Sequence, residues 1–184
     1  LVGHEFTTDK SSDFNAILTT LKGKKPDIIF FGGMDAVAGP MLKQMKQLGI
    51  SAKFMGGDGI CTAELAKLAA EGMADENVFC AEAGGVEGEQ KAGMEKFRTD
   101  FKAKYNAEVQ VYAPYVYDAV KVMVQAMVTA GSSDPAKYLP ALKSINYKGV
   151  TGNIAFDEKG DIKNGALTLF TYKAGKREQI AVVR

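Results

Sequence analysis

Short apolar runs alternate with amphipathic stretches up to Ala83, and this alternation constrains the fold more than any other feature of the chain. Three of the runs are typical of strands: PDIIFFGG at 26–33, AKFMGG at 52–57 and NVFCAEA at 77–83. Residues 36–49 and 62–69 lie between them and carry apolar side chains at every third or fourth position, as amphipathic helices do. This order predicts an α/β fold with a parallel open sheet and right-handed crossovers. Because residues 28–31 are wholly apolar, we expect that strand to be buried on both faces.

The character of the chain changes after Ala83. Residues 84–90, GGVEGEQ, are polar and glycine-rich, and we interpret them as a crossing between two lobes. Residues 152–183 alternate apolar runs with the turn sequences EKGD and KAGKRE. That pattern predicts antiparallel strands joined by turns.

Helices are expected between these two segments. One covers residues 91–105, a second runs from Tyr115 to Ala130 and stops at Gly131, and a third begins after Asp134. The side chains expected on the buried face of the second helix share helical spacing and are apolar: Val116, Ala119, Val120, Met123, Val124 and Met127.

Charge and motif content exclude several classes of protein. Lys and Arg number 23 against 22 for Asp and Glu, so the basic surface that nucleic acids or anionic membranes attract is not expected. His4 is the only histidine, and Cys61 and Cys80 lack the paired spacing of a zinc site, so we expect neither a metal nor a cofactor. The phosphate-loop, dinucleotide and nucleophile-elbow motifs do not occur, which argues against an enzyme. The two cysteines can be reduced and buried, or can form one disulfide.

Glycines follow two neighbouring strands of the predicted sheet, and one of these glycine-rich stretches carries a carboxylate. Gly32 and Gly33 follow the first strand, and Gly56 and Gly57 lead into Asp58 after the second. Ligands of open α/β sheets bind beyond the carboxyl ends of the strands, and a carboxylate withdrawn from water there needs a cationic partner such as an ammonium group. The alternative is that Asp58 caps the helix near Thr62 or turns the chain in water.

Two segments of the chain resemble those of a known family. DFNAILTTLKGKKPDIIFFGGMDAVAGPMLKQMKQLGISAKFMGGDG, followed later by GVTGNIAFDEKGDIKNGALTLFTY, resembles the branched-chain amino acid (leucine, isoleucine, valine) binding proteins of bacterial ABC importers. The resemblance covers nearly the whole chain but only the second half of the family members. It implies the type I periplasmic binding protein fold, with parallel open sheets and flanking helices in two lobes, here incomplete. Residues 1–83 and 164–184 would form the second lobe, and residues 84–163 would complete the first.

The resemblance also implies roles for particular residues. Asp58 aligns with the acidic residue that binds the ligand ammonium group, Met34 with a position where an aromatic residue often lines the pocket, and Tyr112 with an aromatic residue that contacts the ligand side chain. Gly33 and Gly57 open the backbone beside them. A core or hinge position is the alternative for Tyr112. Because family members are exported, the resemblance favours a disulfide between Cys61 and Cys80.

The implied function is capture of an amino acid by lobe closure, without catalysis. Closure would withdraw Asp58 from water against the ligand amine, and the closed form would be recognised by a membrane permease. We expect a periplasmic monomer whose signal peptide lies upstream of these residues. The alternatives are a sensor or receptor domain of the same fold that binds an amide or another small amino compound and, more distantly, an enzyme of flavodoxin-like architecture.

Overall fold

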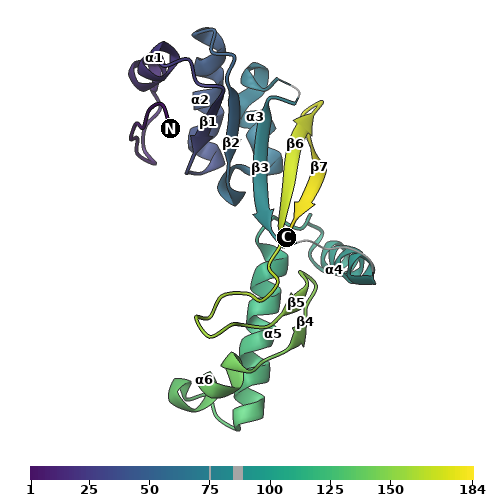
Figure 1. The fold of residues 1–184 in the computed structure, drawn as a ribbon. Coiled ribbons are helices and arrows are strands. Elements are labelled where there is room, and N and C mark those ends of the chain that lie inside the picture. Colours follow the sequence, from purple (N-terminus) through teal and green to yellow (C-terminus); the bar gives the residue numbers. More distant parts are fainter. Residues whose placement is uncertain (75, 85–88) are drawn as a thin grey trace. The chain divides into compact units, whose positions relative to one another are not determined.

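The computed structural model describes residues 1–74, 76–84 and 89–184, and these residues form two compact units (Figure 1). Unit 1 contains Leu1–Ala83 and Leu167–Val183, and unit 2 contains Gly84–Ala166 together with Arg184. The first boundary follows Ala83, where the composition changes, and the second lies at Leu167 rather than at Asn164. Most of the crossing expected at 84–90 lies outside the described residues.

Unit 1 is built on a mixed five-stranded sheet with the order β1-β2-β3-β6-β7. Its strands are β1 (Ile28–Phe31), β2 (Lys53–Gly56), β3 (Val78–Ala83), β6 (Leu167–Lys173) and β7 (Lys176–Val183). The first three are parallel, as the alternating pattern predicts, and β6 and β7 form an antiparallel hairpin that pairs with β3.

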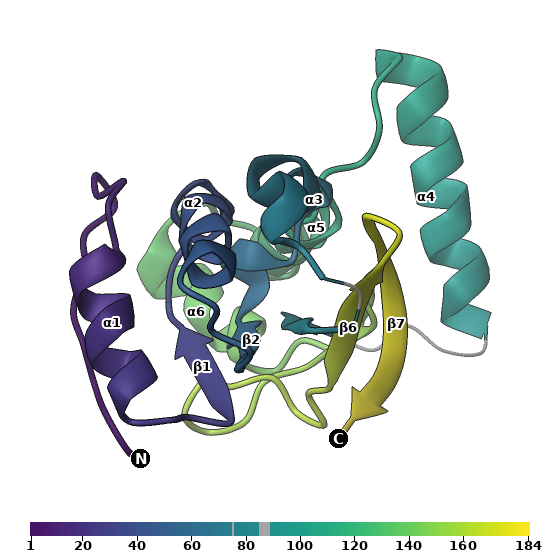
Figure 2. The same cartoon turned by 90° about the horizontal axis from the view of Figure 1, so that it is seen from above.

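Helices cover one face of this sheet, and Figure 2 shows α2 and α3 on that side. The helical elements of unit 1 are α1 (Asn15–Gly23), α2 (Asp35–Gln47), η1 (Asp58–Ile60), α3 (Ala63–Ala69) and η2 (Ala70–Gly72). The core between helices and sheet joins apolar side chains from every layer, among them Phe14, Leu18, Met41, Phe54, Leu65 and Val78. The burial of the helix residues explains why apolar side chains recur at every third or fourth position of the helices.

The prediction that β1 is buried on both faces is wrong for the described chain. Ile29 is buried, but Phe30 is 65% exposed. The reason is topological, because β1 is an edge strand and the core helices pack on one side only. Apolar side chains favour burial, but whether they are buried depends on whether another helix or strand packs over them.

Gly39 marks the close approach of α2 and α3. A Cβ atom at this position would lie 2.5 Å from the Cβ of Leu68 and 2.9 Å from its carbonyl carbon. We expect Gly39→Ala to destabilise the protein by about 1–3 kcal/mol, because the two helices would have to separate. Thermal unfolding measures this, with Gly93→Ala in α4 (Glu89–Tyr105) as the control, since a Cβ at Gly93 meets nothing within 4 Å. Equal melting temperatures for the two variants would contradict the expectation.

Unit 2 contains three helices and short strands within the described residues. These elements are α4 (Glu89–Tyr105), α5 (Ala113–Ala130), α6 (Pro135–Lys143), β4 (Tyr147–Lys148) and β5 (Asn153–Ile154). Gly131 ends α5 in the left-handed conformation with φ 60°, as predicted, and the Asp134 side chain caps α6 by accepting a hydrogen bond from the Ala136 amide. No described helix is long and apolar enough to cross a membrane.

The predicted buried face of α5 is wrong. Val116, Val120 and Val124 are all at least half exposed, whereas the buried side chains are Pro114, Asp118, Val122 and Ala126. The packed row includes a carboxylate, because Asp118 accepts hydrogen bonds from residues 150 and 151. The prediction used apolar spacing alone, so it chose the row that contains Val120. It missed the row that contains Asp118, whose carboxylate can be buried because it accepts hydrogen bonds.

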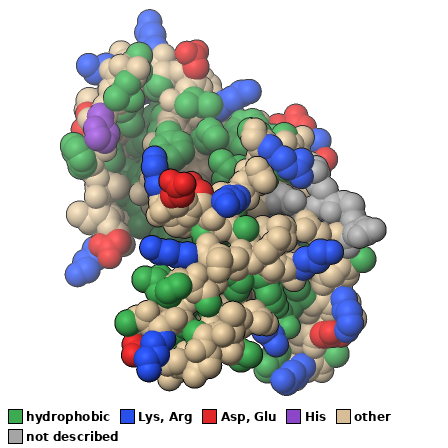
Figure 3. All heavy atoms as spheres, turned by 60° about the horizontal axis from the view of Figure 1, so that its bottom comes forward, with side chains coloured by type: hydrophobic (Ala, Val, Ile, Leu, Met, Phe, Trp, Pro, Cys, Tyr) green, Lys and Arg blue, Asp and Glu red, His purple; other side chains and the backbone are tan. Residues whose placement is uncertain are grey.

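Charged side chains are scattered over the face shown in Figure 3 rather than gathered into one patch of a single sign. This agrees with the nearly equal numbers of acidic and basic residues, 22 and 23.

Candidate functional site

The candidate site of unit 1 lies where β1 and β2 end. Phe31 and Gly56 are partners in the parallel ladder, so the loops that follow them start side by side. The loop after β1 contains Gly33 and Met34, and the loop after β2 contains Gly57 and Asp58. The structure therefore brings together four of the five ligand-binding residues expected from the sequence.

The two loops pack closely against each other at Gly59. A Cβ atom on Gly59 would lie 2.6 Å from the Gly33 carbonyl oxygen and 2.8 Å from the Met34 sulfur. The Thr62 hydroxyl also donates a hydrogen bond of 2.6 Å to a carboxylate oxygen of Asp35. Glycine is required at position 59 because the backbone of the loop after β2 touches the backbone of the loop after β1.

Asp58 is exposed at the start of η1, and the described part of the chain provides no partner for its carboxylate. The alternative role as a helix cap is wrong, because Thr62 caps α3 and accepts a hydrogen bond of 3.1 Å from the Leu65 amide. Gly57, which precedes Asp58, has open space where a Cβ would be. Unit 1 thus presents a carboxylate to solvent and does not itself withdraw it from water.

Met34 and Tyr112 are both partly exposed, but they belong to different units. Met34 immediately precedes α2 and is 51% exposed beside the Asp58 loop. Tyr112 immediately precedes α5 in unit 2 and is 42% exposed, so it is not a buried core residue. Unit 1 places Met34 next to Asp58, whereas the role of Tyr112 stays a prediction.

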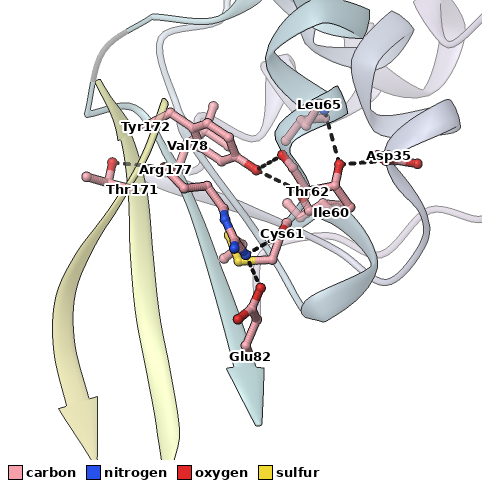
Figure 4. Close-up of a disulfide and its surroundings, with 11 residues drawn as sticks. Asp35, Ile60, Cys61, Thr62, Leu65, Val78, Glu82, Thr171, Tyr172 and Arg177 are labelled. Carbon is pink, nitrogen blue, oxygen red and sulfur yellow. Dashed lines mark hydrogen bonds and ion pairs between the residues drawn. A yellow bond between two sulfur atoms is a disulfide. The ribbon is translucent and has the colours of Figure 1, made fainter. Parts of the chain in front are cut away.

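A network of side chains surrounds residues 60–62, and apart from its disulfide it was not predicted from the sequence (Figure 4). Cys61 and Cys80 form a disulfide with a Cα–Cα distance of 5.3 Å, which the resemblance favoured. Beside it, Arg177 makes an ion pair with Glu82 and donates a hydrogen bond to the Cys61 carbonyl oxygen. The Tyr172 hydroxyl lies 2.9 Å from the carbonyl oxygens of Ile60 and Thr62, and burial raises the pKa of Tyr172 above its ordinary range. The sequence pattern placed Arg177 in the expected turn KAGKRE, so it did not indicate this network.

A hollow of about 530 Å³ lies in unit 2 and contains none of the predicted site residues. Its lining is a mixture of aromatic, charged and small residues: Gly93, Lys96, Phe97, Asp100, Phe101, Lys104, Tyr105, Tyr117 and Val150. Most of them come from α4, whose aromatic side chains Phe97, Phe101 and Tyr105 contact one another along the helix. It lacks the combination of open backbone and unpaired carboxylate found in unit 1.

Known proteins of one family match nearly the whole chain. A family model of periplasmic binding proteins matches residues 1–177. The leucine-, isoleucine-, valine-, threonine- and alanine-binding protein of Pseudomonas aeruginosa is 35% identical over 161 residues, which cover 87% of this chain and 42% of that protein. A Leu/Ile/Val-binding protein homologue of Brucella abortus is 34% identical over 165 residues, which cover 89% of this chain and 43% of that protein.

Solved structures show the same fold. The leucine-binding protein LivK of Thermotoga maritima matches with a TM-score of 0.82 and 26% identity, over 97% of this chain and 51% of that one. The branched-chain amino acid transporter substrate-binding protein LivJ of Streptococcus pneumoniae, in complex with isoleucine, matches with a TM-score of 0.77 and 28% identity, over 96% and 49%. The chain thus spans about half the length of the relatives it matches. By sequence and by its type I fold, the chain belongs to the periplasmic binding protein family and resembles its branched-chain amino acid binding members.

Proposed function

We propose that the chain forms part of an extracytoplasmic solute-binding protein, which captures a branched-chain or related amino acid between two lobes for delivery to an ABC importer. The observation that carries this proposal is the Asp58 carboxylate, which is exposed at the carboxyl end of a parallel strand and has no partner among the described residues. An ammonium group suits such a carboxylate, because a hydrogen bond between two charged groups is stronger than one between neutral groups.

The binding step follows from the change in surroundings that a ligand brings. In water, a carboxylate and an ammonium group attract each other weakly, by about 1 kcal/mol at 4 Å. Lobe closure removes that water, so the same charge pair becomes stronger and stabilises the closed form. We propose that the permease recognises this closed form.

The side chain of the ligand requires an apolar surface next to the amine site. Met34 supplies one, since the residue is 51% exposed and its sulfur packs against Gly59, the residue that follows Asp58. A flexible thioether adapts to differently branched side chains. We propose that Tyr112 and chain beyond these 184 residues complete the pocket, because the matched relatives are about twice as long.

A thermal-shift panel of the twenty common amino acids on the full-length protein tests the proposal. Leucine, isoleucine or valine is expected to raise the melting temperature, since a ligand at a hundred times its Kd adds about 2.7 kcal/mol to stability. 4-Methylpentanoate, which is leucine without its amino group, serves as the matched control and is expected to give little shift. Stabilisation by small amides and by none of the amino acids would instead favour the receptor alternative, because a carboxylate also accepts hydrogen bonds from amide N–H groups.

A further inference from the structure

Three successive backbone carbonyl groups after Asp58 lie within hydrogen-bond distance of two side chains of the C-terminal hairpin, and the single hydroxyl proton of Tyr172 is shared between two of these carbonyl groups. Ile60 and Thr62 are contacted by the Tyr172 hydroxyl, and Cys61 between them is contacted by Arg177. Tyr172 lies on β6 and Arg177 on β7, so both donors belong to the C-terminal hairpin. Figure 4 shows the two side chains reaching from the hairpin toward the same loop.

The loop depends on these donors because it has little regular structure of its own. η1 contains only three residues, and its hydrogen bond from the Ile60 amide to the Gly57 carbonyl oxygen is long, at 3.4 Å. The Cys61 amide bonds back to the Asp58 carbonyl oxygen at 2.9 Å, which makes the backbone of Asp58 part of the same turn. Any shift of residues 60–62 therefore moves the Asp58 backbone as well.

Both donors are themselves fixed. Tyr172 is fully buried, and the Arg177 guanidinium stacks over the Phe170 ring at 4.7 Å while it pairs with Glu82, whose side chain is 13% exposed. The disulfide to Cys80 on β3 adds a covalent attachment at Cys61. A rigid second layer of this kind is what a precisely aimed binding group requires.

We propose that Tyr172 and Arg177 are positioning residues of the amine site: by holding the carbonyl groups of residues 60–62 they set the direction of the Asp58 carboxylate. This inference rests on the proposed function, in which Asp58 binds the ligand ammonium group. The two residues act through the loop and do not touch the ligand.

Tyr172→Phe tests the inference because it removes only the hydroxyl and keeps the buried ring. In the full-length protein we expect faster hydrogen exchange at the amides of Ile60 and Cys61 without ligand, and about three- to tenfold weaker binding of L-leucine by calorimetry. Arg177→Lys should give a smaller loss, since an ammonium group keeps the positive charge beside Glu82 but cannot stack over the Phe170 ring as the planar guanidinium does. Tyr105→Phe, at a tyrosine 58% exposed in α4, is the matched control and should change neither measurement.

A double-mutant cycle separates positioning from general stability. If Tyr172 acts through Asp58, then Tyr172→Phe should no longer weaken leucine binding when Asp58→Asn is already present. Additive losses, or unchanged exchange of the loop amides in Tyr172→Phe, would overturn the positioning role whatever the ligand. Normal leucine binding by Asp58→Asn alone would reject the proposed function and with it the amine-site role, and that result is independent of the exchange data.

Discussion

Replacing Asp58 by alanine is expected to weaken the binding of L-leucine to the full-length protein at least tenfold. The carboxylate has no partner within the described residues, so its contribution to binding would come from the ligand alone. Removal of one member of a charge pair that becomes desolvated on binding costs several kcal/mol. Isothermal titration calorimetry measures the change, and thermal unfolding of the free variant should remain close to that of the parent protein because Asp58 is exposed.

Two comparisons make this expectation specific. Asp100→Ala removes another exposed aspartate, which is paired with Lys96 on α4, and should leave leucine binding unchanged. Binding of 4-methylpentanoate, which lacks the amine, should be no weaker in Asp58→Ala than in the parent protein. An unaltered leucine affinity in Asp58→Ala would show that the amine binds elsewhere.

Replacing Asp118 by alanine is expected to destabilise unit 2 by about 1–3 kcal/mol. Its buried carboxylate accepts hydrogen bonds from the amides of Val150 and Thr151 at 3.0 and 2.8 Å, and from the Thr151 hydroxyl at 2.6 Å. Alanine leaves these donors without an acceptor and opens a cavity on the packed row of α5. Gly149 touches the same carboxylate, since a Cβ there would lie 2.3 Å from one of its oxygens.

Hydrogen exchange of the Val150 and Thr151 amides in the full-length protein measures this effect locally. Both amides should lose protection in Asp118→Ala. Asp118→Asn should lose less, because the amide oxygen still accepts while the amide nitrogen faces a donor. Asp100→Ala again provides the control, since exposed pairs contribute little. Retained protection in Asp118→Ala would mean that the loop is held by other contacts.

The sequence predicts the sheet of unit 1 well because local patterns determine most of it. The first three strands are separated by helices whose apolar spacing is regular, and this order leads to parallel pairing. The tail hairpin follows from apolar runs around AGK at 174–176. Exposure is predicted less well, because Phe30 and Val120 look like core residues by composition and no described element covers them.

In the candidate site, too, local sequence patterns predict one part, and contacts between distant segments determine the other. Strand ends rich in glycine identify the loops of Gly33 and Asp58, because parallel strands deliver their carboxyl ends to one edge. The residues that hold the Asp58 loop from the C-terminal hairpin could not be predicted in this way. Arg177 and Glu82 are far apart in the sequence, and only the antiparallel pairing of β6 with β3 and β7 brings them together.

The order of synthesis gives the topology of unit 1 a biological consequence. β3 pairs with β2 on one side and with β6 on the other, and β6 and β7 are synthesised later than β1, β2 and β3 because they follow them in the chain. Until then β3 presents an unpaired edge, which is a template for pairing with another chain. A nascent chain that stalls before Leu167 would therefore expose the edge of β3, and that edge is where a chaperone that acts during translation would be expected to bind.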